Sequence, residues 1–146
     1  MADPNLRFDT IIMKLRESHY KVTPQRMAIA KILATSEGHP SVDKIYDRLK
    51  ADFPTMSLTT VYRNVMIIKS IGEVLELGFP DGRNRYDGNT PYPHPHVICV
   101  NCHKIIDPNL PNLKDITEGV AEETGFEILR HRLDFFGICP NCQESE

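Results

Sequence analysis

The sequence predicts an α+β fold with two domains, and three observations lead to that prediction. Four consecutive segments of the first half place apolar residues at helical spacing. Two short alternating segments follow, joined by the turn signal Asp81-Gly82. The rest of the 146-residue chain combines further alternating segments with one helical segment and two Cys-x-x-Cys pairs. We therefore expect residues 1–87 and 88–146 to form two small domains.

The first two expected helices follow from their apolar stripes and from one capping signal. The first stripe consists of Phe8, Ile11, Ile12 and Leu15. A second helix is expected to begin at Pro24, with Thr23 as its N-cap, because proline suits the first helical position. The apolar residues that follow are Met27, Ile29, Ala30 and Leu33.

A serine precedes each of the next two expected helices. Ser41 caps a third helix, which ends at Asp52-Phe53-Pro54. Ser57 caps a fourth, whose expected buried face consists of Leu58, Val61, Val65 and Ile68. Residues 73–79 and 83–86 then form the strands of the expected hairpin. Helices followed by a β-hairpin are the order of a winged helix-turn-helix domain.

The outer face of the fourth helix has side chains suited to contacting DNA. It carries small or flat hydrogen-bonding side chains near the helix N-terminus, namely Thr59, Thr60, Tyr62, Arg63 and Asn64. Such groups can reach base edges and thymine methyls in a major groove. The pattern also fits an ordinary solvated helix face, because helix-turn-helix geometry has no strict sequence signature.

The second half predicts a small α/β domain. Residues 96–106 alternate around the first cysteine pair and predict a hairpin, and Leu110 to Val120 predict a helix that ends at Thr124-Gly125. Residues 126–138 predict one long strand that leads into the second cysteine pair. A unit of this size would expose much apolar surface, which dimerisation would bury.

All four cysteines lie in two Cys-x-x-Cys pairs separated by 36 residues. Each pair can place two thiolates on one cation from a tight turn, so together they predict a tetrahedral structural Zn(II) site. Disulfides or a redox dithiol are the alternatives at this spacing. The expected ligands are Cys99, Cys102, Cys139 and Cys142.

Histidines near the first pair suggest a second metal site. His94 and His96 project to the same side of an extended, proline-stiffened segment, where both can bind one ion. His39, Asp87 and Asp107 each have an ordinary loop or turn explanation in isolation. His103 is expected to be exposed, and His131 is expected to be a packed histidine, with metal binding by either left open.

Composition excludes several other classes. No apolar run approaches the roughly 20 residues of a membrane helix, and residues 1–9 have no secretory pattern, so a cytoplasmic protein without membrane contact is expected. Residues 1–80 carry 11 basic against 9 acidic side chains, and residues 81–146 carry 6 against 11. This asymmetry permits DNA binding by the first half and cation binding by the second. An enzyme is not expected, because no nucleophile–base pair or phosphate loop is present.

The ordered motifs resemble the ferric uptake regulator family of bacterial metal-dependent repressors, over about residues 8–142. The matching motifs are Val22-Thr23-Pro24-Gln25-Arg26, Gly38-His39-Pro40-Ser41, Thr60-Val61-Tyr62-Arg63-Asn64, residues 94–102, Lys104-Ile105-Ile106-Asp107 and residues 137–142. The resemblance implies a homodimer, with a winged-helix DNA-binding domain followed by a dimerisation domain. It also implies an operator that is an AT-rich inverted repeat.

The resemblance further implies a regulatory Fe(II) or Mn(II) site formed by His39, Asp87, His94, His96 and Asp107. This set of three histidines and two aspartates is similar to that of the peroxide-responsive repressor branch, in which His39 and His94 would be the ligands that peroxide oxidises. A further ligand set of iron-sensing members would need the positions of Pro93 and Pro95, which cannot bind metal.

Three hypotheses of function follow from the sequence. The first is a DNA-binding repressor that senses peroxide through metal-catalysed oxidation of a histidine ligand. The second is an iron sensor of the same family that responds to Fe(II) availability, and Arg63 after Tyr62 is similar to many such members. The third, of a different class, is a thiol redox switch that uses the cysteine pairs themselves.

Overall fold

The computed structural model describes residues 2–79 and 82–144 and divides the chain into two compact units, residues 1–92 and 93–146. We call these the N-terminal unit and the C-terminal unit. The boundary predicted from the sequence follows Asp87, whereas the structure keeps residues 88–92 with the first unit. The Gly88 amide donates to the carbonyl of Leu33 at 3.0 Å, and the Asn89 side chain donates to the carbonyl of Ala34 at 2.9 Å.

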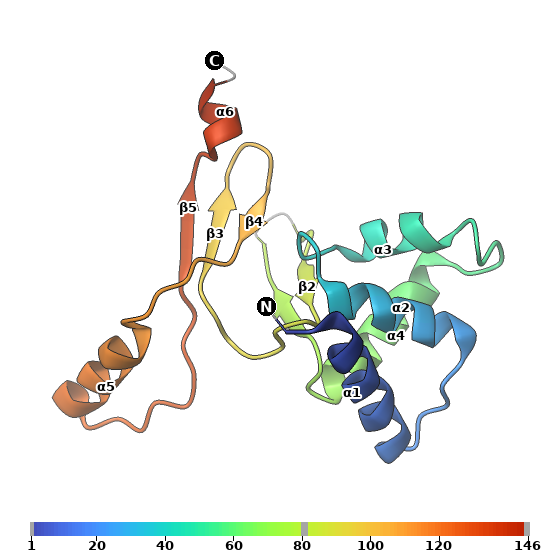
Figure 1. Ribbon diagram of the computed structural model, residues 1–146, viewed down its shortest axis with the longest axis horizontal. Coiled ribbons are helices and arrows are strands. Elements are labelled where there is room, and N and C mark those ends of the chain that lie inside the picture. The colour runs from blue at the N-terminus through green and yellow to red at the C-terminus, as the bar shows by residue number, and fades with distance from the viewer. Residues whose placement is uncertain (1, 80–81, 145–146) are drawn as a thin grey trace. The chain divides into compact units, whose positions relative to one another are not determined.

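Four helices build the N-terminal unit (Figure 1). They are α1 (Pro4–Glu17), α2 (Pro24–Thr35), α3 (Val42–Leu49) and α4 (Leu58–Ser70). The three predicted caps are confirmed, since the Thr23, Ser41 and Ser57 side chains each accept a backbone N–H of the following helix. The first helix begins before its apolar stripe because the Asp3 side chain accepts the Asn5 amide and caps it.

The core of this unit contains side chains from all four helices. Its fully buried members include Ile11, Leu15, Ile29, Leu33, Ile45, Val61, Val65 and Ile68. Two residues of the predicted stripes remain outside it: Met27 is 40% exposed and Leu58 is 43% exposed. Leu58 is the first residue of α4, and Val61, almost one turn later, is the first to reach the core.

A β-hairpin follows the helices, as predicted. Strands β1 (Leu75–Leu77) and β2 (Arg85–Asp87) pair antiparallel, although Asp81 of the predicted turn lies outside the described residues. Glu76 ties the hairpin to the end of α4, because its carboxylate accepts hydrogen bonds from Lys69 and, at 2.6 Å, from the Tyr86 hydroxyl. Burial opposes ionisation of Glu76, yet these hydrogen bonds lower its pKa overall.

Gly88 lies where β2 ends against the backbone of α2. A Cβ at this position would stand 2.7 Å from the Leu33 carbonyl oxygen, so we expect Gly88→Ala to destabilise the N-terminal unit by about 1–3 kcal/mol. Gly78→Ala is the matched control, since among the described residues its methyl group would meet only Asn84 Oδ1, at 3.9 Å. Urea unfolding of the full chain, followed by circular dichroism, measures both. Equal unfolding midpoints for the two variants would contradict the steric argument.

The C-terminal unit is built on a three-stranded sheet with strand order β4-β3-β5 (Figure 1). Strand β3 (His96–Cys99) pairs antiparallel with β4 (Ile105–Ile106) and parallel with β5 (Asp134–Gly137). Helix α5 (Leu113–Thr124) connects β4 to β5 and ends at Gly125, whose φ of 75° forms the left-handed cap. The predicted hairpin and helix are therefore confirmed.

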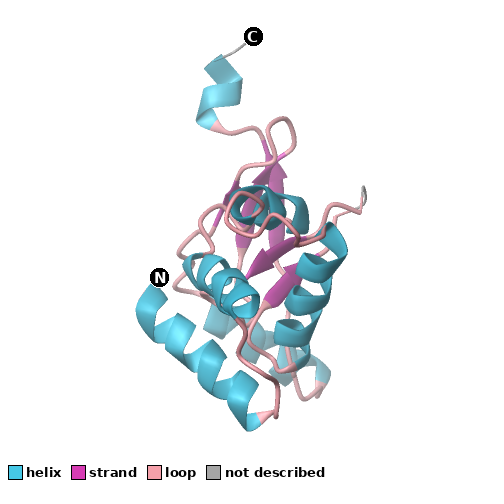
Figure 2. Cartoon of the chain, turned by 90° about the vertical axis from the view of Figure 1, so that its right-hand side faces the viewer, coloured by secondary structure: helices cyan, strands magenta, loops and turns pink. Residues whose placement is uncertain are grey.

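The long strand predicted over residues 126–138 is wrong. Only Asp134–Gly137 is strand, and the alternating residues before it include Phe126 and Leu129, which are 72% and 86% exposed. Among the described residues, no strand pairs with 126–133, so alternation alone does not make them part of a sheet. The structure adds a short helix that was not predicted, α6 (Pro140–Glu144), which Figure 2 shows at the C-terminal end.

Within residues 2–79 and 82–144, every helix is too short or too polar to span a membrane.

Candidate functional site

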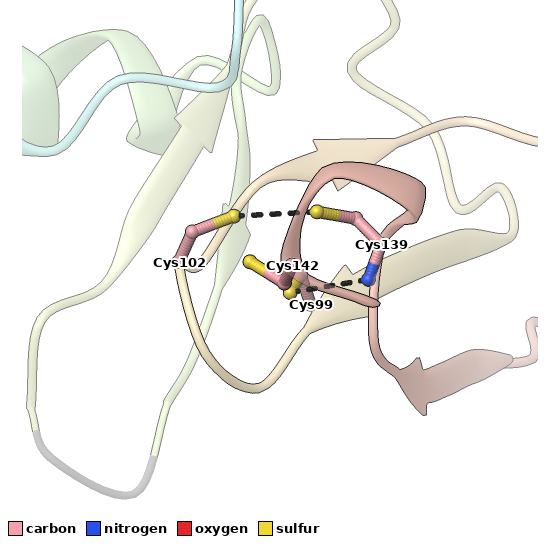
Figure 3. A group of neighbouring side chains, drawn as sticks. All are labelled: Cys99, Cys102, Cys139 and Cys142. Atoms are coloured by element: carbon pink, nitrogen blue, oxygen red, sulfur yellow. Dashed lines mark hydrogen bonds between the residues drawn. The ribbon is translucent and has the colours of Figure 1, made fainter. Parts of the chain in front are cut away.

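The two cysteine pairs come together at one end of the C-terminal sheet (Figure 3). Cys99 ends β3 and pairs in register with Gly137 of β5, so the parallel pairing brings Cys139 close to it. All four Sγ atoms lie within 4.8 Å of one another. The Cys102 and Cys139 sulfurs are 3.8 Å apart, and the Cys139 amide donates to Cys99 Sγ at 3.3 Å.

This donor set fits zinc. Tetrahedral Zn–S bonds of about 2.3 Å place neighbouring sulfurs about 3.8 Å apart. Backbone N–H groups of Cys102 and Cys139 lower the pKa of the Cys99 thiol to about 6, whereas hydrogen bonding with Cys139 raises that of Cys142 to about 12. Four adjacent thiolates repel one another, and a divalent cation would remove that repulsion. None of the four cysteines forms a disulfide, and Cys102 and Cys139, whose sulfurs are 3.8 Å apart, belong to different pairs.

A second cluster in the C-terminal unit offers only nitrogen and oxygen donors. His96 Nε2 lies 3.1 Å from His94 Nε2 and 3.7 Å from an oxygen of Asp107, whose other oxygen is 3.2 Å from His94 Nε2. Neighbouring ligands of an octahedral ion at about 2.1 Å lie about 3 Å apart. The spacing therefore fits three adjacent ligands of one metal ion. His96 is 2% exposed, whereas Asp107 is 37% exposed.

His39 and Asp87 form a pair within the N-terminal unit, with His39 Nδ1 3.6 Å from Asp87 Oδ2. Asp87 is 1% exposed, and its Oδ1 accepts the backbone amides of Asn89 and Thr90 at 2.9 and 3.0 Å. These two bonds fix the carboxylate with Oδ2 directed at the histidine. His39 has a φ of 50°, a left-handed conformation that is uncommon outside glycine.

Arg85 secures the turn that carries His39, and the sequence analysis missed it. Its guanidinium donates to the carbonyls of Gly38 and His39. Arg85 and Asp87 lie two residues apart on β2, so both project from the same face of the strand. That spacing is the signal that could have linked Arg85 to the candidate ligands.

Two further histidines, His103 and His131, lie outside the clusters described above. His103 is exposed in the turn after Cys102, with a φ of 65°. His131 is partly buried, and its Nε2 is enclosed without a hydrogen-bond partner among the described residues. Neither belongs to a cluster of three or more metal-ligating groups within those residues.

The expected DNA-contacting face of α4 divides into exposed and buried residues. Thr59, Tyr62 and Arg63 are exposed, and Thr60 is half-buried with its hydroxyl 3.0 Å from Ser57 Oγ. Asn64 is only 7% exposed, so the base contact expected of it does not agree with the structure.

Asn64 instead joins α4 to α2 through Arg26, which the sequence analysis did not single out. The Asn64 amide donates to the Thr60 carbonyl at 2.9 Å, and its Oδ1 accepts Arg26 Nε at 2.8 Å. The same guanidinium lies 5.7 Å from the centre of the Tyr20 ring. Asn64 therefore holds the Arg26 guanidinium beside α4 rather than reaching outward.

Comparisons with known proteins identify the family of the chain. The model of the ferric uptake regulator family matches residues 17–136. The peroxide-responsive repressor PerR of Staphylococcus aureus (strain USA300) is 41% identical over 133 residues, which cover 91% of this chain and 89% of that protein.

Two solved structures extend the comparison. PerR from Streptococcus pyogenes is 37% identical, with 93% of this chain and 92% of that chain covered and a TM-score of 0.53. The Helicobacter pylori ferric uptake regulator Fur, at 24% identity, shares the fold over 99% of this chain and 96% of that chain, with a TM-score of 0.84. The α+β fold and the resemblance inferred from the motifs are thus confirmed: the chain belongs to the ferric uptake regulator family.

Proposed function

We propose that this chain is a homodimeric, metal-dependent repressor that releases DNA when peroxide oxidises a histidine of its regulatory site. The observation that supports this most is the separation of donor types. Four thiols form one cluster, and two imidazoles with a carboxylate form another in the same unit. Thiolates suit structural Zn(II), whereas imidazole and carboxylate suit Fe(II) or Mn(II). One ion therefore stabilises the fold and the other responds to the environment.

The regulatory ion is proposed to take ligands from both units. The C-terminal unit supplies His94, His96 and Asp107, and the N-terminal unit supplies His39 and Asp87. Either set alone leaves an octahedral ion far from complete coordination, whereas the five together leave one position open. Metal binding would then favour the arrangement of the two units in which all five ligands meet. In that way the ion would control how the recognition helices are presented to DNA.

Bound Fe(II) would supply the redox chemistry that activates peroxide. One peroxide oxygen would enter a ring C–H bond of His39 or His94, and the other would leave as water. The oxidised ring is a poorer ligand, so the site loses the ion and the arrangement that binds DNA. Aspartate at positions 87 and 107 is the ligand choice that the peroxide-responsive resemblance implies, and PerR of Staphylococcus aureus is 41% identical to this chain.

DNA recognition is proposed to use the exposed start of α4. Thr59, Thr60, Tyr62 and Arg63 would enter the major groove of an AT-rich inverted repeat. Asn64 would contribute indirectly, by fixing Arg26 beside the helix.

Exposed apolar side chains of the C-terminal unit support the homodimer. They lie on α5, on the segment after it and on β5, and include Ile116, Val120, Phe126, Leu129, Phe135 and Phe136. A twofold dimer would bury this surface and present two recognition helices to an inverted repeat.

Mass spectrometry of the Fe(II)-loaded protein after brief peroxide treatment tests the sensing mechanism. We expect one added oxygen atom on His39 or His94, together with loss of operator binding. The Mn(II)-loaded protein is the control and is expected to keep both histidines unmodified and to stay bound to DNA. Unmodified histidines in the iron-loaded protein, with DNA binding retained, would reject peroxide sensing and favour an iron sensor. Loss of DNA binding through cysteine disulfides alone would favour a thiol switch.

A further inference from the structure

Asp134 stands directly opposite His96 in the C-terminal sheet. The two residues begin β5 and β3, and they form the first pair of the parallel register. Both side chains are nearly buried, with 9% of Asp134 and 2% of His96 exposed. The carboxylate oxygen Oδ1 lies 3.3 Å from His96 Nδ1. An acidic side chain thus faces the ring nitrogen that points away from His94 and Asp107.

A second contact fixes the orientation of this carboxylate. Arg132 Nε donates to the other oxygen, Oδ2, at 2.7 Å. Arg132 is itself 61% exposed, so its charge is partly screened by water. The carboxylate is therefore restrained from both sides, with Oδ1 directed at the imidazole.

The carboxylate determines which nitrogen of His96 can bind a metal ion. An ionised carboxylate only accepts hydrogen bonds, so the neutral imidazole places its proton on Nδ1 to donate to Asp134. The lone pair then lies on Nε2, which is 3.1 Å from His94 Nε2 and 3.7 Å from Asp107. A carboxylate behind a ligating histidine also makes the metal-facing nitrogen a better donor.

We propose that Asp134 is a positioning residue for the regulatory metal, acting through His96. The inference rests on the proposed function, in that it takes His96 to be a ligand. It adds a connection between the two metal sites, because β5 begins with Asp134 and leads directly to Cys139. Zinc held by the four cysteines keeps β5 against β3, and that pairing keeps Asp134 behind His96.

Two measurements on the full-length, zinc-loaded protein test the proposal. The first is ¹⁵N NMR of histidine ring nitrogens without added Fe(II) or Mn(II), with the His96 signals assigned by their loss in His96→Gln. We expect the Nδ1-protonated tautomer in the wild type and a shift toward Nε2 protonation in Asp134→Ala. The second is Mn(II) titration, in which Asp134→Ala is expected to bind about 10- to 100-fold more weakly at unchanged zinc content.

Two further variants sharpen the result. Asp134→Glu keeps a carboxylate and is expected to retain the wild-type tautomer with a smaller loss of affinity. Asp115→Ala removes an acidic, exposed residue of α5 and is expected to change neither measurement.

The outcomes separate this proposal from the proposed function. An Nε2-protonated His96 in the wild type would overturn the positioning role whether or not any variant folds. Weaker Mn(II) binding by Asp134→Ala with an unchanged tautomer would overturn it too, since the effect would then be merely structural. A different result would reject the regulatory site itself: Asp107→Ala binding Mn(II) as tightly as the wild type does.

Discussion

Cys99→Ser is expected to lose the structural zinc, unfold the C-terminal unit and leave a monomer. Cys99 is the most buried of the four cysteines, at 3% exposed, and its sulfur accepts the Cys139 amide that brings the second pair into place. Structural zinc contributes about 10–16 kcal/mol of folding free energy in small domains, whereas a whole domain is stable by only about 5–15 kcal/mol. Losing most of the zinc contribution would therefore match or exceed the stability of this small unit.

Metal analysis and analytical ultracentrifugation measure this outcome. We expect the wild type to hold one zinc per chain as a dimer, and Cys99→Ser to hold none as a monomer. Asn101→Ser is the control, because Asn101 is an exposed residue of the same Cys-x-x-Cys turn and supplies no thiolate. The N-terminal unit has its own core, so its helical circular dichroism signal should persist. A zinc-loaded dimer of Cys99→Ser would show that the quartet is not the structural site.

Asp107→Ala is expected to have the opposite profile: intact zinc and dimer, but DNA binding that no longer responds to Fe(II) or Mn(II). Asp107 is 37% exposed and lies close to both His94 and His96, so its removal takes away a proposed ligand without opening the core. Losing a direct ligand should weaken metal binding by about 100-fold or more, because outer-shell changes alone cost 10- to 100-fold. Mn(II) titration and operator-binding assays with and without Mn(II) measure the two effects.

Arg63→Ala is the matched control for that experiment. Arg63 is exposed on α4, outside both metal clusters, so this variant should bind Mn(II) normally and still bind DNA weakly. Asp107→Ala should instead bind Mn(II) weakly, and its loss of Mn(II)-dependent DNA binding should follow from that. If Asp107→Ala instead lost zinc and dimerisation as Cys99→Ser does, the division into structural and regulatory sites would be wrong.

Local chemistry explains which parts of the fold were predictable from the sequence. Thr23, Ser41 and Ser57 mark three helix starts correctly, because an N-cap acts on amides within the next three residues. The strand predicted over residues 126–138 is too long because strand formation depends on a partner segment that is distant in the sequence. Alternation indicates which side chains share a face. A strand also needs a neighbouring strand to pair with, and the alternating residues themselves do not reveal one.

The same distinction applies to the site. The cysteine cluster was predictable because the spacing within each pair is local and the two pairs account for all four cysteines. Arg85 and Asp134 were missed because each acts on a residue that only chain folding brings near, one across 46 positions and the other across 38. Asn64 was misassigned because its partner, Arg26, lies on another helix.

The parallel pairing of β3 with β5 also sets an order of events during protein synthesis. The N-terminal unit ends at residue 92, before either cysteine pair, so it can fold while the rest of the chain is still being made. Strand β3 and the first pair emerge next, and the 36 residues before the second pair take about 2–7 s at typical translation rates. A metal ion held by all four cysteines can therefore bind only after the second pair has been made. Under the proposed function, a cell short of zinc would accumulate chains whose N-terminal unit is folded but which cannot yet dimerise.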